Sequence, residues 1–474
     1  MNDPIIFYID LFCGAGGTST GIEKANANAK VIACVNHDQK AIESHKANHP
    51  DCLHFVEDIR DFNVVLKLKA IVEKLRKSEP NCIINIWASL ECTNYSKAKG
   101  GLPRDADSRT LAEHLFMYLE ELNPDYLYIE NVREFMSWGP LDKNGRPISR
   151  RNGSDYVKWC NKVQSYGFDF EHRILNAADF GAYTSRQRYF GQFAKKGLPI
   201  SWPEPTHVKN LDKEDGMSAS EKKRWKPVKD VLDLSDEGVS IFKRKKELSD
   251  NTLKRIYAGL IKFVAGGNEE FMTQFGGGDP TSKVWGINRP TRTVTSFTHS
   301  KVKGVFLSTY YGNGGTTDID QSCPTITTKD RVSKIHPTFL LDYQFSNKGR
   351  SIEETGPTII ARQDKKPLYI INCDSAKEFG IVVFEDDSEI VIKIKEFMVM
   401  YQIIDIKMRM LRVDELLRIQ GFPKGYKLKG TKTDQKRFIG NAVEVNQAKA
   451  LIKANYNGLV KFLRIAANKP KHQG

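Results

Sequence analysis

The sequence lacks both the long apolar run of a membrane protein and the paired cysteines of a zinc or disulfide scaffold. No stretch of about 18 apolar residues occurs, and the opening residues Met1–Pro4 are not typical of a signal peptide. None of the eight cysteines forms a Cys-x-x-Cys pair, and most lie in apolar, strand-like runs. We therefore expect no membrane association, no metal and no disulfide framework, and a protein of the reducing cytoplasm.

The sequence also has too few acidic residues to balance its basic ones. Lysine and arginine total 72 against 58 aspartate and glutamate, which gives a formal net charge of +14 over 474 residues. Such an excess is typical of proteins that bind a polyanion, and without a membrane segment nucleic acid is the leading partner. The hydrophobic content of 40% is that of a globular protein, and the length allows two or three domains.

The N-terminal part of the chain alternates between apolar strands and helices. Residues 5–13 form a predicted strand that leads through the glycine-rich turn 14–17 into a helix over 18–28. The turn lacks the complete Gly-x-Gly-x-x-Gly pattern, but the backbone N–H groups of the following helix can face a ligand. A tight turn that requires positive φ is the alternative interpretation of these glycines. A second strand, 31–35, ends at polar residues where related folds hold ribose hydroxyls, and a helix over 39–48 follows.

Polar side chains follow each of the next strands directly. Asp58, Cys92 and Glu130 come just after three strand-like runs. This alternation predicts a doubly wound, mostly parallel α/β sheet with its site at the carboxyl ends of the strands. A cysteine at such an end can act as a nucleophile, although a single cysteine is more often a buried apolar residue. The strands are expected at 53–56, 82–90 and 126–129, and the helices at 64–77, 110–122 and 155–166.

Basic side chains accompany this predicted site. Lys97 and Lys99 lie in a glycine-containing loop that reads as mobile. Arg186 and Arg188 alternate within an expected edge hairpin over 180–190, so on a strand they share one face. Two arginines on one face either bind a phosphate or carboxylate or stand in solvent.

The composition changes after residue 196, where several prolines mark a linker. Pro-Thr pairs begin at residues 290, 324 and 357, at spacings of 34 and 33 residues, and basic residues recur around them. We interpret this as three related β-units that contact the groove of a nucleic acid, with a plain structural β-domain as the alternative. Near the C-terminus, an amphipathic helix over 412–420 and a helix from 445 to about 454 flank a Gly-Asn turn that either completes a ligand pocket or caps the helix.

The order of these segments resembles the C5-cytosine DNA methyltransferase family over residues 5–195 and about 285–455. Residues 10–17 (Asp-Leu-Phe-Cys-Gly-Ala-Gly-Gly) are similar to the family's AdoMet-binding turn, and Cys92 falls where its catalytic cysteine lies. Further motifs match at 130–132 (Glu-Asn-Val), 420–423 (Gln-Gly-Phe-Pro) and 440–443 (Gly-Asn-Ala-Val).

The chain departs from the family pattern in three places. Glu91-Cys92-Thr93 stands where the family has Pro-Cys-Gln, and Thr184 replaces the first glutamine of Gln-x-Arg-x-Arg. A carboxylate aimed at the sulfur would raise the pKa of the thiol and slow its attack. The acidic ribose ligand is replaced by Asn36, whose amide can still hydrogen-bond a hydroxyl.

The resemblance implies a fold and an activity. It implies an AdoMet-binding catalytic domain over 1–195, a target-recognition domain with three β-rich repeats over 196–409, and a segment over 410–474 that returns to the catalytic domain. The implied reaction transfers a methyl group from AdoMet to C5 of cytosine in a specific duplex DNA sequence, through a covalent bond between Cys92 and C6 of a flipped-out base. Structured RNA such as tRNA is an alternative substrate, and a catalytically silent DNA-binding protein is an alternative of another class.

The resemblance also implies a set of site residues and partners. We expect double-stranded DNA as partner, a monomer, a cognate restriction endonuclease as a candidate companion, and a cytoplasmic, nucleoid-associated protein of a prokaryote or phage. The expected catalytic residues are Cys92, Glu130, Arg186 and Arg188; the AdoMet-binding residues are Phe12, Gly14, Gly16, Gly17, Asn36, His37, Asp58, Ile59, Asn441 and Val443; and the DNA-binding residues are Lys97, Lys99, Arg292, Lys329, Arg331 and Arg362.

Overall fold

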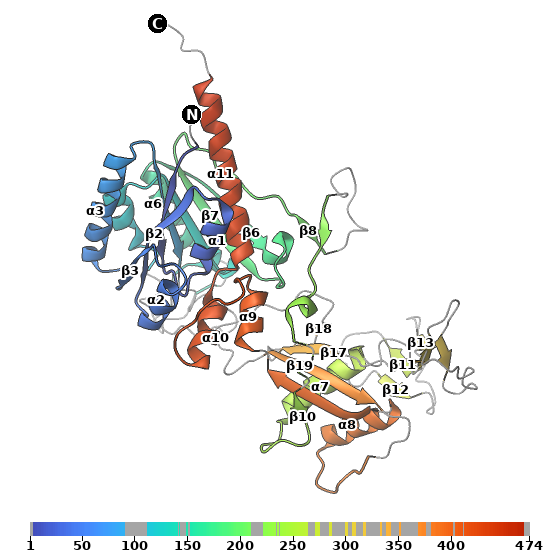
Figure 1. Ribbon diagram of the computed structural model, residues 1–474. Helices are drawn as coiled ribbons and strands as arrows, with labels where there is room; N and C mark the ends of the chain where they lie inside the picture. Colours follow the sequence, from blue (N-terminus) through green and yellow to red (C-terminus); the bar gives the residue numbers. More distant parts are fainter. Residues whose placement is uncertain are drawn as a thin grey trace. The chain divides into compact units, whose positions relative to one another are not determined.

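The described chain divides into two compact units, one of residues 1–232 with 412–474 and the other of 233–352 with 366–411 (Figure 1). Each unit is described by itself. The structure is a computed structural model and describes residues 3–90, 111–140, 142, 148–149, 152–209, 221–233, 235–236, 238–263, 381–401, 403–410 and 412–468; between 264 and 380 it describes only the strands named below.

A seven-stranded sheet forms the centre of the first unit. Its strand order is β3-β2-β1-β4-β5-β7-β6, with the first five strands parallel and β7 antiparallel to both of its neighbours. This order confirms the doubly wound, mostly parallel fold expected from the alternation of strands and helices. The strands are β1 Ile6–Leu11, β2 Ala29–Asn36, β3 Leu53–Val56, β4 Ile83–Ser89, β5 Tyr126–Asn131, β6 Phe168–Asn176 and β7 Gln187–Lys195.

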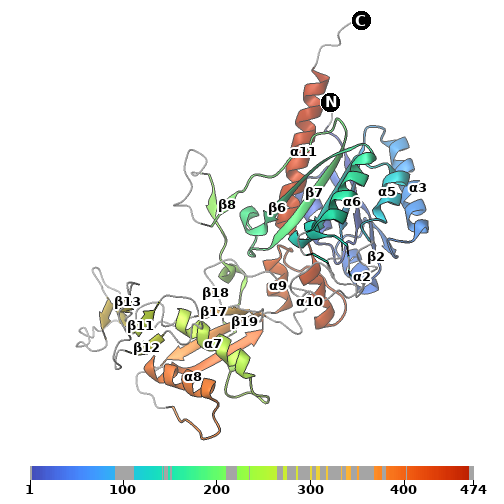
Figure 2. The same cartoon turned by 180° about the vertical axis from the view of Figure 1, so that it is seen from behind.

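Helices cover both faces of this sheet, as Figures 1 and 2 show. The helices α3, α5 and α6 pack on one face, whereas α1 and α11 pack on the other. The unit contains α1 Gly17–Ala25, α2 Gln39–Lys46, α3 Phe62–Ser78, α5 Leu115–Leu122, α6 Ser154–Ser165, α9 Val413–Ile419, α10 Lys432–Asn441 and α11 Val445–Ala467, with the short strands β8 His207–Val208 and β9 Lys223–Arg224 and the 3-10 helices η2 Arg133–Ser137, η3 Ala177–Phe180 and η6 Val228–Val231.

The strand sequences explain why the sheet buries both faces. In β1, Phe7 and Ile9 belong to the apolar cluster under α3, α5 and α6, while Ile6 and Tyr8 belong to the cluster under α1 and α11. Successive side chains of a strand point to opposite faces, so a continuous apolar run fills two cores at once. The same alternation places Ile86 of β4 in the first cluster and Trp87 in the second.

Two glycines of α1 allow α11 to pack closely against it. A Cβ added to Gly17 would lie 2.5 Å from the carbonyl oxygen of Val443, and one added to Gly21 would lie 2.6 Å from the Cβ of Ala448. The C-terminal helix therefore completes a core that the N-terminal helix begins. It reaches Ala467, well past the expected end near residue 454, because apolar residues such as Leu459 continue its buried face.

The hairpin expected at the sheet edge over residues 180–190 does lie at an edge, but its strands have other bounds. They are β6 and β7, joined through η3, and β6 is the edge strand. The proline-rich segment after residue 196 remains attached to the sheet. The hydroxyl of Tyr126 donates to the carbonyl of Pro199 at 2.9 Å, and the side-chain oxygen of Asn455 accepts the N–H of Ser201 at 3.3 Å.

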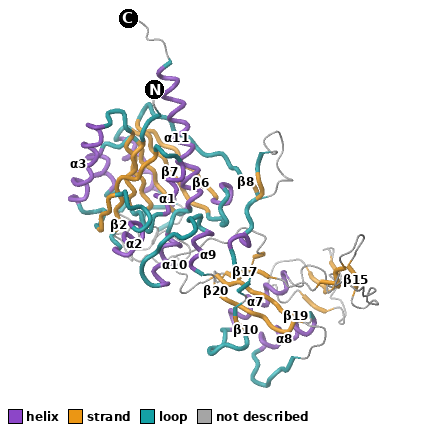
Figure 3. The backbone as a smooth tube through the Cα atoms, viewed as in Figure 1, coloured by secondary structure: helices purple, strands orange, loops and turns teal. Residues whose placement is uncertain are grey.

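The second unit is β-rich. A five-stranded sheet, β10-β20-β19-β17-β18, packs against α7 and α8 around one apolar cluster (Figure 3). β11, β14 and β17 each pair antiparallel with the two strands that follow them, so one pairing pattern recurs along this part of the chain. The elements are β10 Val239–Ser240, α7 Asp250–Phe263, β11 Phe271–Gln274, β12 Val284–Gly286, β13 His299–Lys301, β14 Phe306–Thr309, β15 Thr316–Asp318, β16 Val332–Ser333, β17 Thr338–Asp342, β18 Arg350–Ser351, β19 Leu368–Ser375, α8 Glu389–Met400 and β20 Ile403–Met410.

Candidate active site

The glycine-rich turn between β1 and α1 has the backbone of a ligand-binding loop. Phe12, Gly14 and Gly16 all have positive φ, at 62°, 54° and 100°. The N-cap of α1 is Gly16, which provides no side-chain hydrogen bond to the first turn of the helix. A Cβ on Gly14 would meet no atom within 4 Å among the described residues, so the turn faces open space there. Backbone donors and the positive end of a helix dipole thus border this space.

Polar groups stand at the ends of β2 and β3, beside this turn in the sheet. Asn36 is the last residue of β2, and its side-chain oxygen accepts the N–H of Asp38 at 2.9 Å. Asp58 follows β3, and its carboxylate binds Arg60, with Nη2 at 2.6 Å from Oδ2. Hydrogen bonds from Arg60 hold the pKa of Asp58 below its ordinary value, and His37 lowers it further. Ile59 is buried, and its carbonyl accepts the hydroxyl of Tyr118 at 2.8 Å.

Glu130 is a buried carboxylic acid at the end of β5. It pairs in register with Ser89 of β4, three positions before Cys92, and its residue surface is only 5% exposed. Burial raises the pKa of Glu130, while Arg188 and then Arg186 oppose that rise. The Nε of Arg188 lies 3.3 Å from Oε1 of Glu130, an ion pair without hydrogen-bond geometry. The pKa of the Glu130 carboxyl group is therefore raised above its ordinary value, mainly by burial.

Arg186 connects this carboxylate to the C-terminal part of the chain. Its Nη1 donates to the carbonyl of Gly440 at 3.2 Å, and its guanidinium weakly opposes the burial that raises the pKa of Glu444. The amide of Gln420 donates to the carbonyls of Ile439 at 3.0 Å and Ala442 at 3.3 Å. The turn after α10 is thus held beside the sheet, with Asn441 exposed and Val443 buried against Gly17.

Several expected site residues lie outside the described residues. These are Cys92, Lys97, Lys99, Arg292, Lys329, Arg331 and Arg362. The described chain nevertheless holds the strand that precedes Cys92. The amide of Asn131 donates to the carbonyl of Leu90 at 3.4 Å, and the indole of Trp87 donates to Ser89 at 2.9 Å. The end of β4 is therefore fixed beside the end of β5.

Sequence reasoning missed one acidic residue of this region. Glu444 is fully buried at the start of α11, and burial raises its pKa to about 7. Its carboxylate accepts the backbone N–H of Gln447 at 2.7 Å as the N-cap of the helix. An acidic residue directly before the helix was the available signal.

The donor set at the strand ends fits AdoMet. The turn offers backbone N–H groups to a carboxylate, and the carbonyl and amide groups of Asn36 and the carboxylate of Asp58 offer partners to hydroxyl and amine groups. Phe12 is partly exposed, whereas Val443 and Ile59 are buried.

Comparisons with known proteins agree with this geometry. The family model described as "C-5 cytosine-specific DNA methylase" matches residues 6–457. The type II methyltransferase M.XorII of Xanthomonas oryzae pv. oryzae is 30% identical over 202 residues, which cover 42% of this chain and 43% of that protein. The type II methyltransferase M.AquIA of a Picosynechococcus species is 26% identical over 227 residues, which cover 47% of this chain and 86% of that protein.

A solved structure is similar in fold. The Entamoeba histolytica methyltransferase EhMeth superposes with a TM-score of 0.50 at 15% identity, covering 95% of this chain and 98% of that chain. The match to M.XorII spans less than half the length of that protein. Among the described helices, none combines the length and the apolar character needed to cross a membrane.

Proposed function

The chain belongs to the C-5 cytosine-specific DNA methylase family, and from that premise we propose that it transfers a methyl group from AdoMet to C5 of cytosine within a specific duplex DNA sequence. The observation that carries this proposal is the buried carboxyl group of Glu130, held between two arginines where β5 ends beside β4. Only two residues separate Cys92 from the end of β4 in the sequence, so a thiol and a protonatable carboxyl group would come from adjacent strand ends.

The cofactor residues would be those of the first three strand ends. The turn of Phe12, Gly14, Gly16 and Gly17 would hold the carboxylate of AdoMet, and Asn36 with His37 would contact its ribose. Asp58 and Ile59 would contact the adenine, and Asn441 and Val443 would close the site. AdoMet, when bound, supplies the electrophilic methyl group that C5 accepts.

The chain's own residues would make C5 reactive. The Cys92 thiolate adds to C6, the ring electrons move toward N3, and N3 takes a proton from Glu130. The C5–C6 double bond is lost and a double bond forms between C4 and C5, which makes C5 the nucleophilic carbon of an enamine. After methylation, a base removes the proton from C5, the C6–S bond breaks, and N3 returns its proton to Glu130. Cys92 thereby leaves as a thiolate and is ready for another cycle.

The two arginines would position this acid. Arg188 contacts Glu130 directly, and Arg186 acts on the same carboxyl group while it binds the backbone of Gly440. Because C5 and C6 are stacked inside a duplex, the target base must be flipped out to reach them. The loop with Lys97 and Lys99 would then close over the extruded base.

The β-rich second unit would contact the DNA. Its basic residues would supply phosphate contacts, with Arg292, Lys329, Arg331 and Arg362 as the residues that we assign to this role. We propose that the protein acts as a monomer in the cytoplasm of a prokaryote or phage-infected cell, with a restriction endonuclease as a candidate companion. The net charge of +14 supports a polyanionic substrate.

Transfer of label from tritiated AdoMet tests this function. The wild-type chain should label cytosine in mixed-sequence duplex DNA, and duplexes containing 5-fluorocytosine should become covalently attached to it. Cys92→Ser should abolish both results and retain AdoMet binding. Cys82→Ser, a matched change at the start of β4, should leave both intact. Label in tRNA but not in DNA would favour the RNA substrate, and folded protein without any label would exclude the enzyme.

A further inference from the structure

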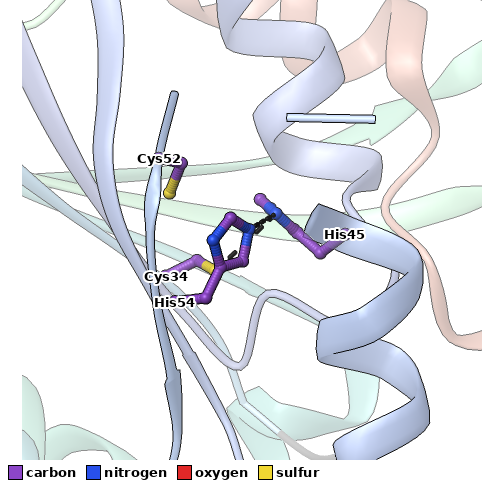
Figure 4. A group of neighbouring side chains, drawn as sticks. All are labelled: Cys34, His45, Cys52 and His54. Carbon is purple, nitrogen blue, oxygen red and sulfur yellow. Dashed lines mark hydrogen bonds between the residues drawn. The ribbon is translucent and has the colours of Figure 1, made fainter. Parts of the chain in front are cut away.

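Four metal-ligating side chains meet on the outer edge of the first unit (Figure 4). Cys34 lies on β2, His45 on α2, Cys52 on the connection between α2 and β3, and His54 on β3. One ligand atom from each lies within 4.8 Å of the other three. The first three residues are buried and His54 is partly exposed, so the group is enclosed by the protein.

The atoms that face one another are those that bind metals. Nδ1 of His45 lies 3.0 Å from Nε2 of His54 and 3.7 Å from Sγ of Cys34. In a tetrahedral site with ordinary zinc bond lengths, neighbouring ligand atoms stand about 3.3–3.8 Å apart. The first distance is about 0.3 Å below this range, the second lies inside it, and the upper limit of the separations in the group, 4.8 Å, exceeds it by about 1 Å. Rotamer adjustments of this size would close the site.

A second layer of hydrogen bonds orients His45. Its Nε2 lies 2.9 Å from Oγ of Ser19, and Ser19 donates to Oδ2 of Asp10 at 2.7 Å. Because Ser19 uses its proton for Asp10, its oxygen accepts the proton on Nε2 of His45. This tautomer leaves the lone pair of Nδ1 directed at the sulfurs. Metal-binding histidines ordinarily give their other N–H to such a carboxylate or hydroxyl partner.

A buried group of two neutral imidazoles and two thiols can alternatively persist without metal as a small hydrogen-bonded core. The chemistry of the donors decides between these states, because two soft sulfurs and two imidazoles together match zinc.

We propose that Cys34, His45, Cys52 and His54 bind one Zn²⁺ ion in a closed, tetrahedral, structural site. Sγ of both cysteines, Nδ1 of His45 and Nε2 of His54 are the ligands. On binding, the two thiols release their protons to solvent, and the two thiolates neutralise the charge of the ion. Four protein ligands leave no open position, so the site stabilises structure and takes no part in a reaction.

The proposed zinc ion would join three neighbouring segments of the chain. The turn Asn36–Asp38 lies between Cys34 on β2 and the start of α2, which carries His45. Zinc would tie this turn, α2 and β3 into one block at the edge of the sheet. The sequence contains no Cys-x-x-Cys motif that would indicate this site. Its ligands come from two strands, one helix and the segment that connects α2 to β3. The inference does not depend on the proposed methyl transfer.

Metal analysis of the full chain, expressed without a histidine tag in zinc-supplemented medium, tests the proposal. One zinc per chain is expected by plasma mass spectrometry. Cobalt exchanged into the site should give the intense visible absorption of a tetrahedral thiolate complex. Cys34→Ser combined with Cys52→Ser should lose both signals. Cys160→Ser, Cys82→Ser and Cys13→Ser should retain them, the last being a thiol close to Cys34.

A milder variant keeps the test decisive if the double variant fails to fold. Ser19→Ala removes the partner of His45 without touching a ligand, and zinc affinity measured against a chromophoric chelator should fall about 10–100-fold. Chelation of the wild type should lower its thermal midpoint. Folded wild-type protein that contains no zinc and gives no spectral response to added Zn²⁺ or Co²⁺ would overturn the proposal. A disulfide between Cys34 and Cys52, seen as a loss of two hydrogen masses, would overturn it equally.

Discussion

At the scale of single residues, Glu130 combines deep burial with two opposing cations. A substitution that removes the ionisable group of Glu130 but keeps the shape of its side chain distinguishes its role in proton transfer from its role in packing. Glu130→Gln should reduce the turnover of labelled methyl groups about 10²–10⁴-fold, because an amide cannot give N3 a proton. Binding of AdoMet and of duplex DNA, measured by calorimetry and fluorescence anisotropy, should change little. A variant that retains more than about a tenth of wild-type turnover would remove Glu130 from the chemical step.

Glu444 should make the folded protein less stable as the pH rises, which is opposite to the effect of most buried, ion-paired carboxylates. Its pKa is raised from 4.5 to about 7 by burial, so the folded state holds this proton more tightly than the unfolded chain. Its contribution to stability is complete below pH 4.5 and is lost as the pH rises through about 7. The free energy of unfolding lost over this pH range amounts to about 3 kcal/mol at most.

Thermal unfolding from pH 5 to pH 8 checks this effect. Glu444→Gln cannot ionise, so the wild type should lose stability relative to the variant as the pH rises. Only the change with pH is diagnostic, because the amide also alters the hydrogen bonds to Gln447 and Asn446. A difference between the two proteins that stays constant across this pH range would show that Glu444 does not titrate there.

The residues of the candidate site were predictable to different extents. Alternation along a strand predicted that Arg186 and Arg188 share one face. Arg188 lies on β7 and Arg186 directly before it, and both act on the pKa of Glu130. The hydrogen bond from Arg186 to Gly440 was not predictable, since it joins residues 254 positions apart. The group of Cys34, His45, Cys52 and His54 was not predictable either, because its members come together only when α2 packs on the sheet.

At the scale of elements, the contact between α1 and α11 leaves no room for a methyl group at Gly21. Gly21→Ala should gain about 1 kcal/mol in helix propensity but lose about 1–3 kcal/mol to overpacking against Ala448. We therefore expect a net loss of about 1 kcal/mol in the free energy of unfolding, measured with urea.

A second substitution at the same contact supplies the control. Gly21→Ala combined with Ala448→Gly restores the space, so the two changes should not add, and the double-variant cycle should show a coupling of about 1 kcal/mol. Additive effects would mean that the helices move apart without cost.

The sequence predicted whether a segment is a helix or a strand wherever the spacing of apolar residues was regular. It predicted less well where each element ends and which strands pair with it. The strand at Leu53–Val56 matches its expected bounds because turn residues flank it. The hairpin expected at a sheet edge over residues 180–190 is formed there by β6 and β7, but its strands run over 168–176 and 187–195. Local sequence indicates that a hairpin forms, whereas the choice of neighbour depends on the apolar surface of β5, which is distant in the chain.

At the scale of the whole molecule, the first unit is built from both ends of the described chain. Leu451, Ile452 and Leu459 of α11 are almost fully buried in its core. Burying each of these side chains stabilises the fold by about 1.5–3 kcal/mol. Losing all three, together with the contacts of α9 and α10, therefore removes more free energy than the typical total stability of a domain. Deletion of residues 412–474 should therefore give insoluble protein or protein without a cooperative unfolding transition.

Deletion of residues 469–474 is the matched control for this experiment. It retains every described helix and should unfold at the same temperature as the full chain. A soluble fragment 1–411 with a cooperative transition would show that the N-terminal part is a complete folding unit.

The segment after residue 196 bears on the domain boundary predicted from the sequence. The change of composition predicts a boundary at residue 196, and residues up to Leu232 belong to the first compact unit. Prolines near residue 200 indicate an irregular backbone, but they do not indicate whether it leaves the sheet. Hydrogen bonds from Tyr126 and to Asn455 hold this segment in place, and both partners lie far from it in sequence.

The pairing of α1 with α11 has a consequence for the ribosome-bound chain. Gly17 and Gly21 emerge early, but the helix that covers them is translated only after the whole second unit. At about 5–20 residues per second, roughly 20–90 s pass between the synthesis of Tyr8 and Trp87 and that of the helix that covers them. During that interval a nascent chain presents an open apolar sheet face, so its yield in a cell should depend on chaperone capacity and translation speed.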